Sequence, residues 1–496
     1  MDFTFNAGPI IAAGGGGGSS AFDTSAYRQD TYGAPTHYVD CTRSLASNGA
    51  GTLGDPWNCN QAMANPVAGN IVGWLPISEC VNSTPVNLAH TTDGHSPAFQ
   101  PANSGTLGNP IVHVTKYAGS WLVGQVGKLA LFSDTRRTEL RHDGSAPTIV
   151  GGFGGSSDTG CAIVGPYNCN YITMDGFCFD MAHAYIEEDS GMIRPDLCTG
   201  AVHRNFAAKG TDVTVASNCV MYRPNGCHDT VLSNFYAWYG RNDGSASATP
   251  QQFHFSDQYG DQNFLMEHFE VSDFDGPVRL KGTYSGAFNY GTIRYGVITD
   301  CGGFLKFNDL DPSNLTTAHN LLCYTTKYNP TLYAGDALYF SLETSTAQNI
   351  LIHHCTFAKV QATDPNLNGC FYANNFSSFD FGSNTTIRDC IFDIDSGTYG
   401  NMVALDNSRP STLDYNYYTK NGSTMTFVYN GSSNTGLAAW QAASSRDANS
   451  VASNTSPFVN RAGNDFTTTG TASTMSSTGG AVGAYGDTTE TIGVIY

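Results

Sequence analysis

Three cationic side chains, Arg279, Lys281 and Lys306, lie close together in a chain that has only 23 lysines and arginines among 496 residues. Because the formal net charge is −19, such a local concentration of positive charge indicates an anionic ligand, for example a uronate or a sialate. A β-eliminating lyase needs a base near the C5 proton of the sugar and a cation that holds the carboxylate as charge develops on it. Lys281 as the base, with Arg279 or Arg294 as the cation, would support that reaction.

Hydrolysis is the alternative chemistry, and its candidate carboxylates are Glu187, Glu188, Asp257, Asp261 and Glu270. A glycosidase needs two carboxyl groups about 5 Å apart to retain the anomeric configuration, or about 6.5–9.5 Å apart to invert it. Glu187 is expected on the strand next to the one that ends at Asp257, unless the insertion between residues 190 and 227 holds a further coil. Carboxylates on an acidic surface are usually solvated, however, and Lys281 could simply neutralise Glu187 or Asp257.

Six of these nine residues, all but Asp261, Glu270 and Arg294, belong to a set of seven short strands that can be aligned by their apolar positions: HAYIEED, QQFHFSDQ, PVRLKG, GFLKFND, ALYFSLE, CFYANN and NMVALDN. Since side chains alternate between the two faces of a strand, the alignment leaves two outward columns. The first column contains Tyr185, His254, Arg279, Lys306, Tyr339, Tyr372 and Ala404. The second contains Glu187, Ser256, Lys281, Asn308, Ser341, Asn374 and Asp406.

Rings, cations and amides in such rows are typical of a saccharide-binding groove, in which rings stack on sugars and polar groups bind hydroxyls or carboxylates. The predicted catalytic residues are Lys281, Arg279, Glu187 and Asp257. The predicted sugar-binding residues are Tyr185, His254, Lys306, Asn308, Tyr339, Tyr372 and Asn374.

A second repeated segment predicts how these strands are stacked. Seven copies of an apolar residue, two mostly polar residues and an alternating apolar pair begin at Asn170, His228, Gln262, Asn289, Ala318, Gln348 and Asn384. Five of their anchor residues, Met266, Ile293, Leu321, Ile352 and Ile387, follow one another at intervals of 27 to 35 residues. Such a period, carried by strands with a polar bend, indicates a solenoid. We expect an all-β fold, a right-handed single-stranded parallel β-helix over residues 36–435, with coils about 4.8 Å apart.

Composition narrows the classes of function. The acidic balance argues against a nucleic-acid partner, because phosphate binding needs a basic field. No apolar run approaches the roughly 20 residues that cross a bilayer. The first twenty residues have no basic segment of the kind that opens an export signal, and the glycine run at residues 14–18 suggests a linker. We expect residues 1–35 to be an anchor and linker.

The chain has 14 cysteines, and their positions favour packing over chemistry. Cys178, Cys355 and Cys390 occupy positions of the repeat that point inward, so we expect them to be buried and reduced. Cys41, Cys59 and Cys80 lie outside the repeat and could form a disulfide.

No metal or cofactor is expected. His353 and His354 are adjacent, so on a strand they face opposite ways, and we expect solvent-facing turn residues rather than a shared metal site. Asp309 and Asp311 have the oxygen-rich character of a calcium loop but lack the ligand run of an EF-hand, so a plain turn is favoured over calcium.

The opening segment resembles a known module. HYVDC is followed by GTLGDPW, a short helical segment and a GN-led strand, as in right-handed parallel β-helix proteins of the phage tailspike and polysaccharide lyase type. The resemblance extends through the repeats to about residue 485. Residues 436–496 are similar to the closing segment of such proteins, with a capping helix that carries Leu437, Trp440 and Ala443 on one face and a following extended arm.

The resemblance implies a phage virion protein, a tailspike that recognises and in some cases depolymerises a host surface polysaccharide. Its expected partners are an acidic host polysaccharide, virion tail or capsid proteins through residues 1–35, and two further copies in a homotrimer. Its expected location is the virion, and the extracellular medium after host lysis. The alternatives are a free extracellular polysaccharide lyase or hydrolase, and a structural virion solenoid without enzymatic activity.

Overall fold

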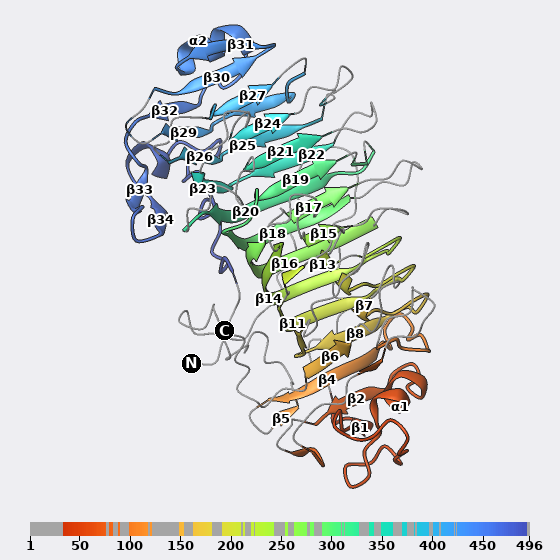
Figure 1. The fold of residues 1–496 in the computed structure, drawn as a ribbon. Helices are drawn as coiled ribbons and strands as arrows, with labels where there is room; N and C mark the ends of the chain where they lie inside the picture. The colour runs from red at the N-terminus through yellow and green to blue at the C-terminus, as the bar shows by residue number, and fades with distance from the viewer. Residues whose placement is uncertain are drawn as a thin grey trace.

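The computed structural model describes residues 33–75, 79–82, 88–89, 99–117, 120–121, 148–152, 162–180, 191–209, 212–213, 220–222, 224–242, 253–255, 262–274, 278–281, 290–308, 310–311, 313–326, 337–341, 349–360, 370–373, 381, 384–395, 400–405, 408–420, 422 and 424–493. These residues form an all-β solenoid, an elongated stack of coils that rises from the first strand to the last (Figure 1). Almost every strand pairs in parallel with the equivalent strand of the next coil, which confirms the parallel β-helix. Its right-handedness stays a prediction.

One face of the stack is a continuous parallel ladder that begins in the first coil. Its strands are β1 (His37–Val39), β2 (Ile71–Trp74), β4 (Ile111–Tyr117), β8 (Ile172–Asp175), β11 (Val202–Lys209), β14 (Val231–Asn242), β16 (Gln262–Phe274), β18 (Tyr290–Thr299), β20 (Thr316–Tyr324), β22 (Ile350–His353), β25 (Thr386–Arg388) and β28 (Thr412–Asp414).

A second ladder adjoins the first around a bend. Five long strands, β11, β14, β16, β18 and β20, belong to both ladders. It also contains β3 (Leu88–Ala89), β6 (Thr148–Gly152), β9 (Cys178–Asp180), β23 (Thr356–Val360), β26 (Ile391–Ile394), β29 (Tyr417–Lys420) and β32 (Val451–Ser453). Two short strands flank the ladders, β5 (Ser120–Trp121) beside β4 and β12 (Asp212–Val213) beside β14.

The remaining face is formed by shorter strands. Three of them pair in the lower coils, β7 (Ala162–Val164), β10 (Gly191–Ile193) and β13 (Val220–Tyr222). Eight more follow: β15 (Phe253–Phe255), β17 (Val278–Lys281), β19 (Leu305–Asn308), β21 (Leu338–Ser341), β24 (Phe371–Ala373), β27 (Val403–Leu405), β30 (Thr426–Tyr429) and β31 (Ser432–Thr435). Only the last pair, β30 with β31, is antiparallel within this eight-stranded sheet.

From the coil of β8 upward, the bend between the two ladders has one backbone feature in common. We call its residues the corner column: Gly176, Asn205, Asn234, His268, Tyr295, Asn320, His354, Asp389 and Tyr415, each with a positive φ between 50° and 85°. A left-handed residue turns the chain sharply, and asparagine, aspartate and glycine tolerate that conformation best. The polar residues in the middle of each repeat therefore mark the bend, as the sequence predicted.

The register corrects two details of the repeat. Ala318, and not Leu321, pairs with Ile293 and Ile352, so the anchors follow at 27, 25, 34 and 35 residues. Leu321 is also buried, but it follows the bend at Asn320. An apolar residue on either side of the bend points inward, and the pattern alone does not distinguish them.

Cys178 is the second correction. It pairs with Ala207, in the position that Thr356 and Ile391 occupy in later coils, whereas Phe177 precedes it as the buried residue after the bend. Cys178 therefore holds an outward register position, one residue away from that of Cys355 and Cys390.

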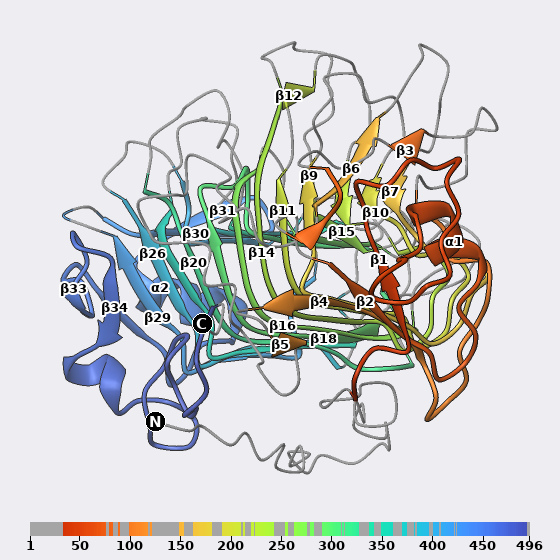
Figure 2. The ribbon, with the colours of Figure 1, turned by 90° about the horizontal axis from the view of Figure 1, so that it is seen from below.

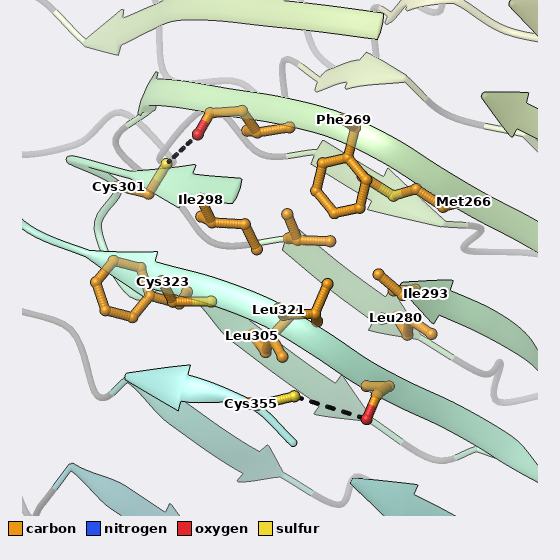
Figure 3. Close-up of a cluster of buried hydrophobic side chains, with 14 of the residues drawn as sticks. Met266, Phe269, Leu280, Ile293, Ile298, Cys301, Leu305, Leu321, Cys323 and Cys355 are labelled. Atoms are coloured by element: carbon orange, nitrogen blue, oxygen red, sulfur yellow. Dashed lines mark hydrogen bonds between the residues drawn. The ribbon is translucent and has the colours of Figure 1, made fainter. Parts of the chain in front are cut away.

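The interior is filled by apolar side chains stacked from coil to coil (Figure 3). Phe206, Phe235 and Phe269 form a stack, and the same core contains Cys301, Cys323, Cys355 and Cys390 with at most 3% exposure. The structure contains these cysteines as free thiols, together with Cys41, Cys59 and Cys80.

We expect the thiols of Cys301, Cys323, Cys355 and Cys390 to resist alkylation in the native protein. Burial raises the pKa values of Cys323 and Cys390, and the thiolate is the reactive species. Labelling with iodoacetamide followed by peptide mass spectrometry measures this. All four should react fully after unfolding without reductant. Rapid native labelling would contradict their burial, and failure to react after unfolding would reveal disulfides.

Both ends of the stack are covered by short helices. α1 (Cys59–Ala64) begins with a capping box in which Asn58 accepts from the Gln61 amide and the Gln61 side chain accepts from the Asn58 amide. α2 (Leu437–Ser444) places Trp440, fully buried, against Phe427 of the last coil. Ala443, predicted to share that face, is exposed, and Ser444 is buried in its place.

Candidate functional site: an outward column on the eight-stranded sheet

The register places four predicted sugar-binding residues and the predicted catalytic residue Arg279 in one row. His254 pairs with Arg279, Arg279 with Lys306, Lys306 with Tyr339 and Tyr339 with Tyr372, one residue per coil. We call these five residues the groove column. Residues on either side of them, such as Leu305, Phe307, Leu338 and Phe340, are buried in the core. The strand alignment made from the sequence is therefore confirmed for this part of the sheet, while the role of the column in binding stays a prediction.

Neighbouring side chains of the groove column contact one another along the stack. The Lys306 ammonium lies 4.7 Å from the centre of the Tyr339 ring, a cation–π contact. The rings of Tyr339 and Tyr372 stack at 5.5 Å with an interplanar angle of 9°. Above them the column continues to Ala404, which is buried. The column thus changes from cationic to aromatic as it rises, and then becomes apolar.

Asn308 keeps its predicted place in the second outward column, where it pairs with Lys281 and Ser341, but its side chain is buried. It is only 1% exposed, and its side-chain oxygen accepts a hydrogen bond from Arg279 Nε at 3.3 Å. Among the described residues, its amide nitrogen has no hydrogen-bond partner. Asn308 therefore positions Arg279 rather than facing solvent, because the guanidinium folds across the end of the β19 strand.

Several predicted site residues cannot be placed in the same detail. Tyr185, Glu187, Asp257 and Asn374 lie outside the described residues, as does Asp309. His254 and Lys281 are placed by their backbone register alone, with Lys281 paired to Asn308.

The insertion between residues 190 and 227 holds further coils, which is the alternative that the sequence left open. It contributes strands β10 and β13 to the short-stranded face, and β13 lies beside β15. Glu187 and Asp257 themselves lie outside the described residues.

Arg294 belongs to a different face from Arg279. It donates to Glu267 at 2.6 Å on the long ladder, next to the corner column. Lower on the same ladder, Arg204 pairs with Asp175 at 2.6 Å, and both side chains are buried. Arg294 is therefore a structural ion-pair residue and not a second cation for Lys281. Sequence reasoning could not assign it, because the position just before each bend is polar in most coils.

The residues considered for metal binding have other roles. Asp311 is buried and caps a turn, accepting from the Ser313 amide and the Asn314 side chain, each at 2.7 Å. His354 is only 3% exposed, which corrects its expected solvent-facing position. Within the described part of the chain, no group of three or more His, Cys, Asp or Glu side chains could hold a metal ion.

Comparison of the chain with protein-family models, with curated proteins and with solved structures gave no match. Among the helices that the structure describes, none has the length and apolar character needed to span a membrane.

Proposed function

We propose that this chain is a tailspike-like β-helix protein of a phage virion that binds an acidic host polysaccharide along the groove column. The observation that carries the proposal is the register, which aligns His254, Arg279, Lys306, Tyr339 and Tyr372 on consecutive coils. The coil spacing of about 4.8 Å is close to the length of one sugar unit, so consecutive sugars could meet consecutive coils.

The order of residues along the groove column suggests how the polymer would lie. Arg279 and Lys306 occupy consecutive coils and would bind carboxylates, since guanidinium and ammonium groups form strong charge-assisted hydrogen bonds. The next two coils present Tyr339 and Tyr372, whose rings already stack on each other, so a sugar would meet their edges and hydroxyls.

Arg279→Ala and Lys306→Ala should each weaken polysaccharide binding by about 1–3 kcal/mol, because each leaves a sugar carboxylate without its cation. Isothermal titration calorimetry with an acidic capsular oligosaccharide measures this directly. Lys359→Gln is the matched control, since it removes one positive charge from the face where Lys359 contacts Asn464. Unchanged affinity in the Arg279/Lys306 double variant, with a native circular dichroism spectrum, would rule out the groove column.

Binding without cleavage and β-elimination are distinguished by the product. If Lys281 acts as a base beside Arg279, incubation with a uronate polymer should release unsaturated oligosaccharides, and Lys281→Ala should abolish them. A non-enzymatic virion protein would leave the polymer intact while still binding it. A purely structural solenoid would neither bind nor cleave the polymer.

Light scattering of the intact chain tests the proposed homotrimer.

A further inference from the structure

The last part of the chain returns along the outside of the stack. After β33 (Phe458–Asn460), β34 (Asp465–Thr468) and a 3₁₀ turn (Gly470–Ser473), residues 476–493 descend beside the upper coils toward the middle of the solenoid (Figure 1). We call these residues the C-terminal arm. In the view along the stack, this C-terminal part lies to one side of the coils (Figure 2).

The C-terminal arm contacts the corner column coil by coil. The amide of Gly483 donates to the Asp389 carbonyl at 2.8 Å, and that of Gly493 donates to the Tyr295 carbonyl at 2.9 Å. Between them, the side-chain amide of the buried Asn320 donates to the carbonyls of Ala484 and Gly486 at 2.9 and 2.8 Å. Asn320 is thus the central clamp of the arm.

The lowest contact is made by His268, whose Nδ1 lies 3.0 Å from the Thr491 carbonyl oxygen. Because a carbonyl only accepts, this nitrogen carries the hydrogen. The arm is therefore held at five consecutive corners, from Asp389 down to His268.

Three more histidines lie beneath or beside the arm. The rings of His319 and His353 stack at 4.9 Å, and His353 Nδ1 lies 3.0 Å from His354 Nδ1. The His319 Nδ1 lies 2.7 Å from the oxygen of the clamp residue Asn320. The cluster is linked to the arm both through Asn320 and through His354.

The hydrogen bond between His353 and His354 depends on the charge of the rings. Two neutral imidazoles can share it, since one Nδ1 carries the hydrogen and the other accepts. A cationic imidazole carries a hydrogen on both nitrogens. If both rings are cationic, two N–H groups face each other and the hydrogen bond is lost.

The arm itself keeps water away from His354. A methyl group placed on Gly486 would lie 2.3 Å from His354 Cδ2, so the arm backbone lies directly on the ring. The side chain of His354 is 4% exposed under this cover. Detachment of the arm would therefore return His354 to water.

We infer that the C-terminal arm is a proton-sensitive latch, which stays on the corner column while His319, His353 and His354 are neutral and detaches when they take up protons.

The surroundings of the three histidines support detachment of the arm on proton uptake. Burial is the largest cause that lowers the pKa of all three histidines, to about 4 for His319 and about 2 for His353. Arg294 and Arg388 oppose a positive charge here, while Glu267, Asp389 and the arm residue Asp487 favour it. Asp487 Oδ2 is 3.4 Å from His354 Nε2, but this contact does not outweigh burial, since the pKa of His354 remains lowered.

His268 has different surroundings and a smaller part in the latch. Burial lowers its pKa, Arg294 adds to that effect, and Glu267 and the arm residue Glu490 oppose it. Protonation of its Nε2 would leave the Nδ1 bond to Thr491 in place. We therefore assign the release to the other three histidines.

The direction in which pH changes arm closure follows from the linkage between closure and proton binding. A histidine with a lowered pKa in the closed state binds fewer protons there than in the open state, so closure is fully favoured above pH 6.5 and weakens as pH falls below it. Each histidine that takes up a proton on opening raises the opening equilibrium constant up to tenfold per pH unit.

Release would uncover an apolar strip on the second ladder. Val297, Leu322, Ile391 and Tyr417 pack against Val482, Ala484 and Ile492 of the arm in one buried cluster. The latch would thus convert a change in pH into a change in exposed apolar surface.

Hydrogen–deuterium exchange of the intact protein tests the latch. With rates corrected for intrinsic exchange, protection of peptides from residues 476–493 should fall by roughly 15-fold between pH 6.5 and pH 5 for each histidine that detachment returns to water. Peptides from β2, at the opposite end of the stack, should keep their protection (Figure 1). Equal protection of the arm at both pH values, or simultaneous loss in β2, would overturn the latch.

Two variants separate titration from simple attachment. His354→Asn removes one titrating ring and suits the positive φ of 50°, so it should reduce the pH dependence by up to about 15-fold. Asn320→Gly removes the clamp without backbone strain, so it should raise arm exchange about equally at every pH. His228→Gln, at an exposed position, is the matched control and should change neither. An undiminished pH dependence in both His354→Asn and His319→Gln would overturn the proposal.

Discussion

Asp447→Ala should lower the free energy of unfolding of the last coil by about 3 kcal/mol, since it leaves several buried donors without an acceptor. Asp447 is 1% exposed and accepts from Trp440 Nε1 at 2.7 Å, from Ser450 Oγ at 2.6 Å and from Tyr418 Oη at 3.0 Å. These donors come from α2, from the loop after it and from β29. One carboxylate therefore fastens the capping helix to the stack.

The backbone of Asp447 adds to this cost. Its φ is +58°, a conformation that aspartate and asparagine tolerate better than alanine. Asp447→Asn keeps one acceptor oxygen and the local preference, so its loss should be smaller. Asp465→Ala, at an exposed position of β34, is the matched control and should stay within about 0.5 kcal/mol of the wild type. Thermal unfolding and exchange of the α2 and β29 peptides give the readout, and an unchanged α2 would contradict the fastening role.

The same carboxyl should make the end of the solenoid sensitive to pH. Burial raises its pKa to about 6, from the usual 3.8. A group with a raised folded-state pKa contributes stability that is fully present below 3.8 and is lost as the pH rises through 6. The difference in unfolding free energy between wild type and Asp447→Asn should therefore shrink from pH 4 to pH 7. This slope is opposite in sign to that of the histidine latch.

The sequence predicted the strands of the groove column well because they have a strict inward–outward alternation. Leu280, Phe307 and Phe340 are large apolar residues with a polar or aromatic residue beside them, so only one alignment buries them all. The lower coils were harder to predict. AVHRNFAAK contains β11, but the inward His203 interrupts its apolar pattern, and the copy was missed.

The C-terminal arm could not be predicted from any repeat. Asn320 binds carbonyls that lie 164 and 166 residues further along the chain. Periodicity describes how each coil pairs with the next one. The arm, in contrast, contacts the corners of five coils and depends on glycines that allow close approach. The burial of His354, which the sequence did not predict, follows from the arm and not from its own strand.

Phe235→Ala should lower the free energy of unfolding by about 3–5 kcal/mol, the usual cost of removing a buried phenylalanine. Phe235 is fully buried in the middle of the phenylalanine stack, with its ring centre 4.7 Å from that of Phe206 and 5.5 Å from that of Phe269. Each neighbour belongs to a different coil that is fixed by its own parallel pairing. The cavity would therefore collapse only partly.

Phe269 is also confined on its other side. It pairs in register with Gly296 of the next coil, where an added methyl group would lie 2.1 Å from the Phe269 ring. Denaturant unfolding measures the loss, and Leu53→Ala, at a residue that is 58% exposed, is the control expected within about 0.5 kcal/mol of the wild type. A loss below about 1 kcal/mol would show that the coils relax around the cavity. Because Phe235 lies under the long ladders, and not under the sheet of the groove column, the folded variant should still bind polysaccharide normally.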